Sequence, residues 1–549
     1  MKTALQPKRT GPLLLAILPV LGIILTLLYV GARMVLVIIS DYQWTDKLVA
    51  WMLLFAEMFI LFHGIGYLVH LLFVIRSRQS WSATDNVPPL KSTPPVAVVV
   101  ASYKEPLDVV EDTLVCFYNL TYSNKRLYFL DDTRYDLPSS DPAAMQAYRA
   151  AIDALCRRLG VNLFRRKWHG AKAGIINDFM EFIDGKTREG FEFQSFTGQD
   201  RTEKEKYLVV FDADANPMPD FIRPLVAFME ANPKLAFVQT PQYYTNFETN
   251  RVAMASGLQQ VVFYEYICEG KSAHGATFCC GTNVIFRREA FLDVGGFDET
   301  SVTEDFVTSM IFHRRGWESR YYNKVSAFNM GPEDLGAYFK QQFRWALGTI
   351  GLLRQLIALL VRHPRALSLA QWWEYLVSGS YYLIGTVFLI IVLCPVLYLF
   401  FTIPTYFSRP EVYALFFIPY FVLTLFIFFS SLSRRNYRIR DIFLGQLLVS
   451  ITFPVYIKAT LLGLLGIRGR FIVTPKGGGT SLPLRDLWPQ LGVAALSFAA
   501  IVWGVQRMIY EPVPAAAMLI NMFWCLYHFA ILSSVLYFNQ PEMKPDQRM

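Results

Sequence analysis

The chain has 549 residues, enough for more than one domain, and 53% of them are hydrophobic while only 17% are charged. A water-soluble domain carries more charge than this, so the composition excludes a wholly soluble protein and indicates that part of the chain is dissolved in lipid. The net charge is +8, but much of the Lys and Arg lies beside apolar runs, which indicates membrane orientation and no nucleic-acid binding.

Residues 1–90 are predicted to form an N-terminal transmembrane pair. The apolar stretches 13–39 and 49–75 each exceed the length of about 20 residues that crosses a bilayer. A secretory signal peptide is the alternative for the first stretch. That stretch is too long for the apolar region of a signal peptide, however, and no cleavage site of small residues follows it.

Residues 91–345 have the composition of a globular domain and follow a proline-rich linker at 88–95. The short apolar runs 96–101, 127–130 and 207–211 end in polar or acidic residues, and helical patterns lie between them. Such runs are typical of buried parallel strands, at whose carboxyl ends ligands bind. We therefore predict an α-helical membrane protein with an inserted cytosolic α/β, Rossmann-like domain.

Residues 346–549 are predicted to hold interface helices and four further transmembrane helices. The stretch 335–363 mixes apolar positions with four basic residues, as an amphipathic helix at the membrane interface does. The four further stretches long enough to cross a bilayer are 375–401, 412–432, 487–505 and 513–538.

The apolar segment 441–467 is also long enough to cross, but it carries Pro454 and Lys458 near its middle. A central lysine costs about 3 kcal/mol on insertion scales. Basic residues flank both ends, and the positive-inside rule places both flanks in the cytosol. We therefore expect an interfacial or re-entrant helix, six crossings of the inner membrane, and both termini and the α/β domain in the cytosol.

Asp212 and Asp214 directly follow the third predicted strand. Two carboxylates at this position can hold Mg²⁺ or Mn²⁺, which prefer oxygen ligands and usually add substrate phosphates. A solvated turn is the alternative for an isolated pair. The seven cysteines lack the spacing of a zinc site and are expected to be free thiols.

The acidic pair is one of a series of ordered motifs. They are Asp131-Asp132, Lys172-Ala173-Gly174 with Asn177, Asp212-Ala213-Asp214, Gln239-Thr240-Pro241, Phe278-Cys279-Cys280-Gly281-Thr282, Thr303-Glu304-Asp305, Gln341-Gln342-Phe343-Arg344-Trp345 and Phe471-Ile472-Val473-Thr474-Pro475-Lys476. From about residue 90 to the last spans, the chain closely resembles the catalytic subunit of bacterial cellulose synthase and related processive family 2 glycosyltransferases. These are membrane enzymes with a GT-A fold that join inverting sugar transfer to extrusion of the product.

The resemblance implies Asp305, beside Glu304, as the general base that takes a proton from the acceptor hydroxyl. A favourable charge at a helix N-terminus is the alternative for this acidic pair. Arg344 and the metal would stabilise the departing diphosphate, and Trp345 would pack on the acceptor sugar. The remaining donor and acceptor contacts that the resemblance implies are Tyr103, Glu105, Asp131, Asp132, Lys172, Cys280 and Gln341. Thr133 replaces the family's usual glycine, so a turn with positive φ is less comfortable there.

The resemblance also implies a gating loop at 468–482, with Phe471, Val473, Thr474 and Lys476 over the nucleotide. The predicted topology places this loop on the cytosolic side, where it can reach the diphosphate. Glu57 and His63 lie in the second predicted span, and intramembrane ionisable groups are candidates for a translocation path. Aromatic residues at the next membrane entry are candidates for its lining, or for an ordinary interface belt. They are Trp372, Trp373, Tyr375, Tyr381 and Tyr382.

The leading hypothesis is a UDP-glucose-dependent synthase of cellulose or a related β-1,3 or mixed-linkage glucan, which passes the growing polysaccharide through the bilayer. An accessory secretion subunit is compatible with it, whereas no C-terminal cyclic-di-GMP-binding domain is expected. A hyaluronan- or chitin-type synthase using N-acetylated sugars is the first alternative, and the gating motif argues against it. The glutamine, arginine and tryptophan motif argues against a single lipid-linked transfer. A transporter with a cytosolic regulatory domain would give no reason for Asp305 or the acidic metal pair.

Overall fold

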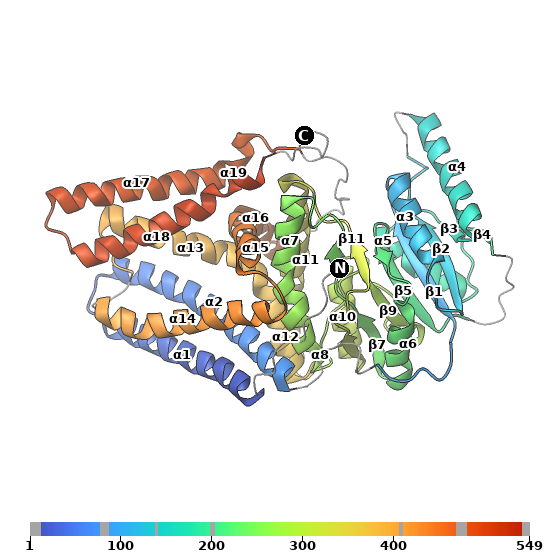
Figure 1. Ribbon diagram of the computed structural model, residues 1–549, viewed down its shortest axis with the longest axis horizontal. Coiled ribbons are helices and arrows are strands. Elements are labelled where there is room, and N and C mark those ends of the chain that lie inside the picture. Colours follow the sequence, from blue (N-terminus) through green and yellow to red (C-terminus); the bar gives the residue numbers. More distant parts are fainter. Residues whose placement is uncertain are drawn as a thin grey trace.

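The computed structural model describes residues 12–76, 87–137, 141–197, 204–405, 410–467 and 480–540. A helical bundle forms one end of the molecule and an α/β domain forms the other, as Figure 1 shows. The helices α7 (Arg251–Val262), α11 (Leu335–Arg362) and α12 (Leu369–Ser380) lie between them. The predicted combination of a membrane protein and an inserted α/β domain is confirmed.

Six long helices run lengthwise through the bundle (Figure 1), and they correspond to the six predicted spans. They are α1 (Pro12–Ile39), α2 (Trp44–Arg76), α13 (Ile384–Phe401), α14 (Pro410–Arg434), α17 (Trp488–Tyr510) and α18 (Ala515–Ser533). By length and apolar composition α11 also qualifies as a span, which makes seven candidates within the described residues. The number of crossings and the side of each terminus therefore stay predictions.

The segment 441–467 forms two helices, α15 (Ile439–Ile451) and α16 (Phe453–Leu464), which meet at an angle of 49°. Pro454 lies in the first turn of α16, where its missing N–H has no partner to lose. The α16 helix packs on α11, and the Tyr456 hydroxyl donates a hydrogen bond of 2.9 Å to Gln342. This bend fits the predicted re-entrant or interfacial helix, and the segment contacts the α/β domain directly.

The main sheet of the α/β domain has eight strands in the order β10-β7-β9-β5-β1-β2-β3-β4. Strands β5, β1, β2 and β3 are parallel to one another in this order. Strand β4 pairs antiparallel with β3, and β9 pairs antiparallel with both β5 and β7. Their bounds are β1 (Val96–Ser102), β2 (Lys125–Asp131), β3 (Asn162–Arg165), β4 (Glu192–Gln194), β5 (Tyr207–Asp212), β7 (Leu235–Gln239), β9 (Val284–Arg287) and β10 (Glu318–Tyr321). A second sheet, in the order β6-β11-β8, consists of β6 (Asn216–Pro217), β11 (Ala327–Asn329) and β8 (Tyr243–Tyr244).

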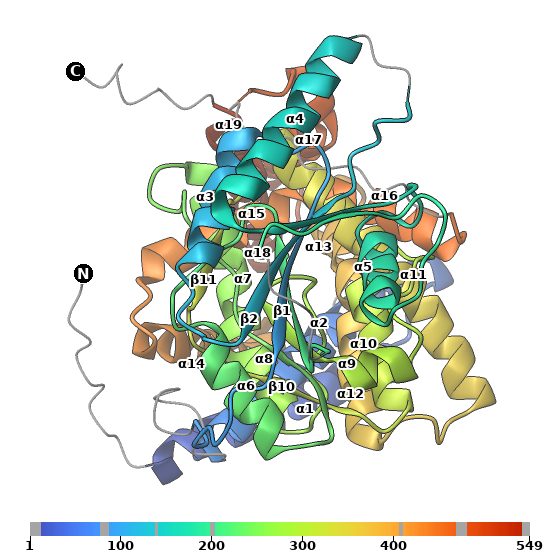
Figure 2. The same cartoon turned by 90° about the vertical axis from the view of Figure 1, so that its right-hand side faces the viewer.

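Helices cover both faces of the main sheet: α3 and α4 lie on one side of β1 and β2, and α5 lies on the other (Figure 2). Alternate residues of β1 enter the two cores, with Val98 in one and Val99 in the other. A strand buried on both faces has no polar side to show, which explains its continuous apolar run. The domain's helices are α3 (Leu107–Tyr118), α4 (Pro142–Leu159), α5 (Ala171–Ile183), α6 (Ile222–Ala231), the π-helix η1 (Phe263–Ile267), α8 (Cys268–Ser272), α9 (Arg288–Asp293) and α10 (Glu304–Arg314).

Three short helices complete the described chain: η2 (Tyr381–Leu383) before α13, η3 (Leu484–Leu487) before α17, and α19 (Val535–Phe538) after α18. The helix α11 begins at Leu335, where the Asp334 side chain accepts a hydrogen bond of 2.7 Å from the Ala337 N–H. It then continues to Arg362, through the domain boundary predicted at residue 345. The end of the α/β domain and the start of the interface helices are therefore one continuous helix.

We expect Gly445→Ala to destabilise the contact between α15 and α7. A Cβ atom there would lie 2.8 Å from the backbone nitrogen of Gln259, which cannot move aside independently, so the cost should be about 1–3 kcal/mol. The apparent thermal midpoint of the detergent-purified protein measures it. Gly351→Ala in α11 is the control, since nothing lies within 4 Å of its Cβ position. Equal midpoints for the two variants would contradict the close approach of α15 and α7.

Candidate active site

A cavity of about 640 Å³ lies at the carboxyl ends of β1 and β5 and extends to the first turn of α10 and to the second and third turns of α11. Most of the site residues predicted from the sequence line it. They are Tyr103, Glu105, Asp132, Lys172, Asp212, Asp214, Cys280, Glu304, Asp305, Gln341, Arg344 and Trp345. The motifs are scattered over more than 240 residues of sequence from 103 to 345, and the fold brings them together around one space.

Lys172 joins two walls of this cavity through hydrogen bonds. Its ammonium group donates to the Asp212 carboxylate and, over 2.7 Å, to the carbonyl oxygen of Gly281. Burial alone would lower the pKa of Lys172, but the Asp212 carboxylate outweighs burial and raises that pKa above its ordinary value. Lys172 therefore stays charged and links the end of β5 to the loop that carries Gly281.

Asp305 and Glu304 form the first turn of α10, and both carboxylates are largely withdrawn from water. Burial, and after it the negative charge of Glu304, raises the pKa of Asp305 to about 7. Burial likewise raises the pKa of Glu304. The positive charges of Lys172 and Arg344 offset part of this effect. A carboxyl group whose pKa is near neutrality can take a proton efficiently, as a general base must.

Gly281 gives the Asp305 carboxylate the room that it occupies. Gly281 has φ +80°, and a Cβ atom there would lie 3.0 Å from Asp305 Oδ2. The preceding backbone is fixed by two buried polar side chains: the Cys280 N–H donates to Gln239 over 2.8 Å, and the Cys279 N–H donates to Ser309 over 2.8 Å. The glutamine of the Gln239 motif therefore supports the loop beside Asp305 and does not line the cavity.

Asp212 and Asp214 present carboxylate oxygens to the cavity from the end of β5. Asp214 is 8% exposed and accepts a hydrogen bond of 3.0 Å from the Met330 N–H through Oδ2. Among the described residues, no group of three or more His, Cys, Asp or Glu side chains is placed to hold a metal ion. The pair therefore fits Mg²⁺ or Mn²⁺ only if ligands such as phosphate oxygens complete the shell, which is the usual arrangement for Mg²⁺.

The α11 helix contributes Gln341, Arg344 and Trp345 from one face, because residues three and four positions apart on a helix are neighbours. Gln342, on the other face, is fully buried against Tyr456 of α16. The wall of the cavity opposite the sheet is therefore held by a helix of the membrane part of the chain.

Of the first acidic pair, Asp131 and Asp132, only the second residue lines the cavity. Asp132 lines the cavity, whereas Asp131 is 2% exposed and bonds to Arg165 over 2.7 Å and to the Tyr135 hydroxyl over 2.8 Å. Asp131 therefore positions Asp132 and does not face the cavity, contrary to the predicted contact. Thr133 does not have a positive φ, but Lys104 does. The backbone N–H of Lys104 donates a hydrogen bond of 3.0 Å to the Thr133 hydroxyl.

Two family models match overlapping parts of the chain: "Glycosyl transferase family 2" over residues 97–295 and "Glycosyl transferase family group 2" over residues 207–429. The cellulose synthase catalytic subunit (UDP-forming) of Pseudomonas fluorescens (strain SBW25) is 26% identical over 96% of this chain and 67% of its own length. Cellulose synthase 2 of Novacetimonas hansenii is 27% identical over 79% of this chain, which spans 26% of that longer protein. The chain is a cellulose synthase-like family 2 glycosyltransferase.

A solved structure, the mannosyltransferase PcManGT from Pyrobaculum calidifontis in complex with GDP-Man and Mn²⁺, matches 75% of this glycosyltransferase and 99% of its own chain. Its TM-score is 0.46 and its identity 15%, too distant to inform the site.

Part of the cavity of this glycosyltransferase was not predicted from the sequence. The loop before α11 lines the cavity from Asn329 to Glu333, and its Gly331-Pro332 pair, typical of a loop, is the only signal that marked it. The predicted gating residues Phe471, Val473, Thr474 and Lys476 lie outside the described residues.

The hypothesis that Asp305 is the base makes a prediction about pH. Only its ionised form accepts a proton, so kcat/KM of this glycosyltransferase should rise as the pH increases through about 7 and then level off. Initial rates measured in buffers from about pH 5 to 9 test it. Asp305→Asn should lower kcat by about 10²–10⁴-fold at every pH. A flat profile, or an active Asp305→Asn variant, would remove Asp305 as the base.

We expect Gly281→Ala to lower kcat by about tenfold or more, because the added methyl group displaces the Asp305 carboxylate. Gly316→Ala is the matched control: Gly316 has a similar φ of +86°, but nothing lies within 4 Å of its Cβ position. The control carries the same backbone strain without the crowding. A loss of activity of equal size in both variants would show that strain alone, and not the position of Asp305, is responsible.

Proposed function

We propose that this protein is a processive, inverting glycosyltransferase that polymerises glucose from UDP-glucose into a β-glucan and translocates the product across the inner membrane. The observation that carries the proposal is the composition of one cavity. It joins the acidic pair of β5, the base candidate of α10 and the arginine and tryptophan of α11. The similarity to cellulose synthases over 96% of the chain supports glucose as the donor sugar and cellulose as the product.

In the proposed reaction the Asp305 carboxylate takes the proton from the acceptor hydroxyl as that oxygen attacks the anomeric carbon of the donor. The bond between that carbon and the diphosphate breaks on the opposite face, so the configuration inverts and UDP leaves. Arg344 and Lys172 line the same cavity and stabilise the negative charge of the leaving diphosphate. Trp345 offers the flat apolar face on which the acceptor sugar packs.

Mg²⁺ or Mn²⁺ is the proposed cofactor, held by Asp212 and Asp214. When bound, the cation neutralises charge on the diphosphate. The hydrogen bond from the Met330 N–H to Asp214 Oδ2 orients this carboxylate, which lines the cavity. Lys172 donates to Asp212 in the same cavity, and we propose that its ammonium group also binds the diphosphate oxygens.

The proposed gating loop, 468–482, follows α16 in the sequence, and Thr480 is its first described residue. The Thr480 hydroxyl donates to the Asp334 side chain over 3.4 Å, and Asp334 caps α11. These two attachments support a loop that can reach the nucleotide. We propose that Thr474 and Lys476 contact the diphosphate and close the site against water.

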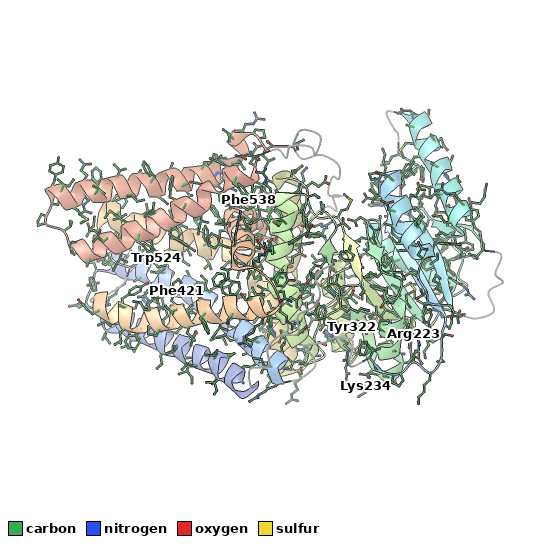
Figure 3. The ribbon with its side chains drawn as sticks, in the orientation of Figure 1. Arg223, Lys234, Tyr322, Phe421, Trp524 and Phe538 are labelled. Atoms are coloured by element: carbon green, nitrogen blue, oxygen red, sulfur yellow. The ribbon has the colours of Figure 1, made fainter. Side chains whose placement is uncertain are left out.

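Translocation is supported by a second cavity, of about 330 Å³, among α1, α2, α13, α14 and α18. Aromatic side chains line it, including Phe421 and Trp524, which are labelled in the bundle in Figure 3. The carboxylate Glu57 of α2 also lines this cavity, and it forms an ion pair with Arg33 of α1 over 2.7 Å. Flat aromatic faces together with a few polar groups suit the two sides of a pyranose ring. A cytosolic catalytic domain, a lipid-embedded bundle and an accessory secretion subunit complete the proposal.

The predicted aromatic lining at the membrane entry needs a correction. Trp372 and Tyr375 of α12 are 4% and 1% exposed and pack against α10, so they do not line a path through the bundle. An aromatic side chain on an interface helix has the same sequence signature whether it faces lipid, a channel or another domain.

The purified protein in liposomes, given each radiolabelled UDP-sugar with Mg²⁺ or Mn²⁺, is expected to form polymer from UDP-glucose. The polymer should be degraded by linkage-specific β-glucanases and be absent with EDTA or with Asp214→Asn, which weakens the metal site. Product from UDP-N-acetylhexosamine alone would favour the hyaluronan- or chitin-type alternative. A failure to form polymer from any donor, with and without secretion partners, would rule out the synthase.

A further inference from the structure

The helix α12 lies between the catalytic helix α10 and the membrane helix α2, and two adjacent side chains of α12 reach these two neighbours. Glu374 and Tyr375 are each 1% exposed. Successive residues of a helix point about 100° apart, so one can contact α2 while the next contacts α10. Neither residue lines the catalytic cavity.

Tyr375 contacts α10 at both of its ends. Its ring stacks on Phe306, with centroids 5.6 Å apart and planes inclined by 17°, and its hydroxyl is 2.7 Å from Nδ1 of His313. Phe306 follows Asp305, and its N–H donates to Asp305 Oδ1 over 2.8 Å. The backbone group that orients the base therefore belongs to the residue on which Tyr375 stacks.

The direction of the hydrogen bond from Tyr375 follows from its neighbours. Burial lowers the pKa of His313 to about 3, so its ring is neutral and carries one N–H. The Ser319 hydroxyl donates to the Thr277 carbonyl over 2.5 Å, so Nε2 of His313 must donate to Ser319, 2.9 Å away. Nδ1 is then an acceptor, and the Tyr375 hydroxyl is its donor.

Glu374 anchors α12 to the membrane bundle. Its carboxylate lies 2.8 Å from Nε2 of His70 on α2 and accepts a hydrogen bond of 2.7 Å from the ammonium of Lys271 on α8. Lys271 also donates to the backbone carbonyl of Glu374 over 3.1 Å, which fixes the peptide unit that joins Glu374 to Tyr375. Lys271 and His70 are each 1% exposed, and breaking such a buried pair costs about 3–5 kcal/mol.

The same cluster also contacts α10 by a second route, through Phe278. The Lys271 ammonium lies 5.2 Å from the ring of Phe278, which packs on Phe306 with centroids 4.5 Å apart. The α8 backbone also approaches α2 closely, since a Cβ atom on Gly270 would lie 2.6 Å from His70. The members of this cluster have little room to shift independently.

We propose that Glu374 and Tyr375 form a strut between the membrane helix α2 and the catalytic helix α10, and that Tyr375 is a positioning residue for Asp305. The inference rests on the proposed function for its catalytic meaning. The strut fixes the base relative to the bundle that receives the product. The reacting hydroxyl is then presented at a constant distance from the membrane through repeated transfers.

Tyr375→Phe tests the strut because it keeps the stacked ring and removes only the hydroxyl. In the full-length protein in liposomes we expect kcat to fall by about tenfold while KM for UDP-glucose and the Kd for UDP stay unchanged, since the cavity is untouched. Hydrogen exchange of residues 304–314 should become several-fold faster, because the acceptor at His313 loses its donor. Exchange in α3, which packs in the other core of the sheet, should not change.

Tyr266→Phe is the matched control. Tyr266 is fully buried, and its hydroxyl donates over 2.6 Å to the Ser431 carbonyl of α14, so it also joins the α/β domain to the bundle without contacting α10. Both kcat and the exchange of α10 should match the wild type. If Tyr375→Phe leaves the exchange and kcat unchanged, or alters KM and UDP binding as much as kcat, the strut proposal is overturned.

A double variant, Lys271→Met with Glu374→Leu, removes the anchor without leaving an unpaired buried charge, and such replacements often preserve stability. We expect it to fold, with a melting temperature somewhat below that of the wild type because the buried His70 Nε2 loses its partner, and to show faster exchange in α10 and the same selective loss of kcat. If the variant is folded and α10 exchanges as in the wild type, Glu374 is no anchor. Failure of the wild type to form polymer, with the exchange effects present, would reject the proposed function and leave the strut in place.

Discussion

The charge of Lys172 is the interaction on which the rest of the site depends. Its ammonium group donates to the Asp212 carboxylate and also interacts electrostatically with Glu304 and Asp305, two carboxylates that burial makes costly to ionise. Without a cation at this point, the negative charges of these carboxylates would repel one another and oppose the approach of the first turn of α10 to β5. The same lysine binds the Gly281 carbonyl, so the neutralising charge also sets the spacing of the two loops.

Helices of the membrane part of the chain hold the helices that line the cavity. The α16 helix holds α11 through Tyr456 and Gln342, and α12 holds α10 through Tyr375 and Phe306. Both α10 and α11 thus contribute residues to the cavity and pack against a helix outside the sheet, α12 or α16. The geometry of the site is determined jointly by the sheet and by the bundle.

The parts of the fold that follow from local rules could be predicted from sequence. The continuous apolar run of β1 predicted a buried strand, and Pro454 with Lys458 argued against a simple crossing by the segment that forms α15 and α16. The mixture of apolar and basic residues at 335–363 predicted the helix that carries Gln341, Arg344 and Trp345. Each of these signals depends only on whether a side chain faces water, lipid, the protein core or a nearby residue of its own helix.

Features that depend on a distant partner could not be predicted. The support role of Asp131 depends on Arg165 from the next strand, and nothing near Asp131 in the sequence distinguishes it from Asp132. Tyr375 has the signature of an interface aromatic, and only the packed structure shows that its neighbour is α10. Glu374 reaches His70 across 304 residues of sequence, a pairing that no periodicity reveals.

The continuity of α11 limits how this enzyme can be dissected. A fragment ending at residue 345 would keep the strands and most of the acidic groups, but Arg344 and Trp345 would then lie on a fraying terminus with α16 missing beside them. The catalytic part is therefore not a module that can be excised, or exchanged between relatives, at a loop. Chimaeras between related chains would need to carry α11 and α16 together.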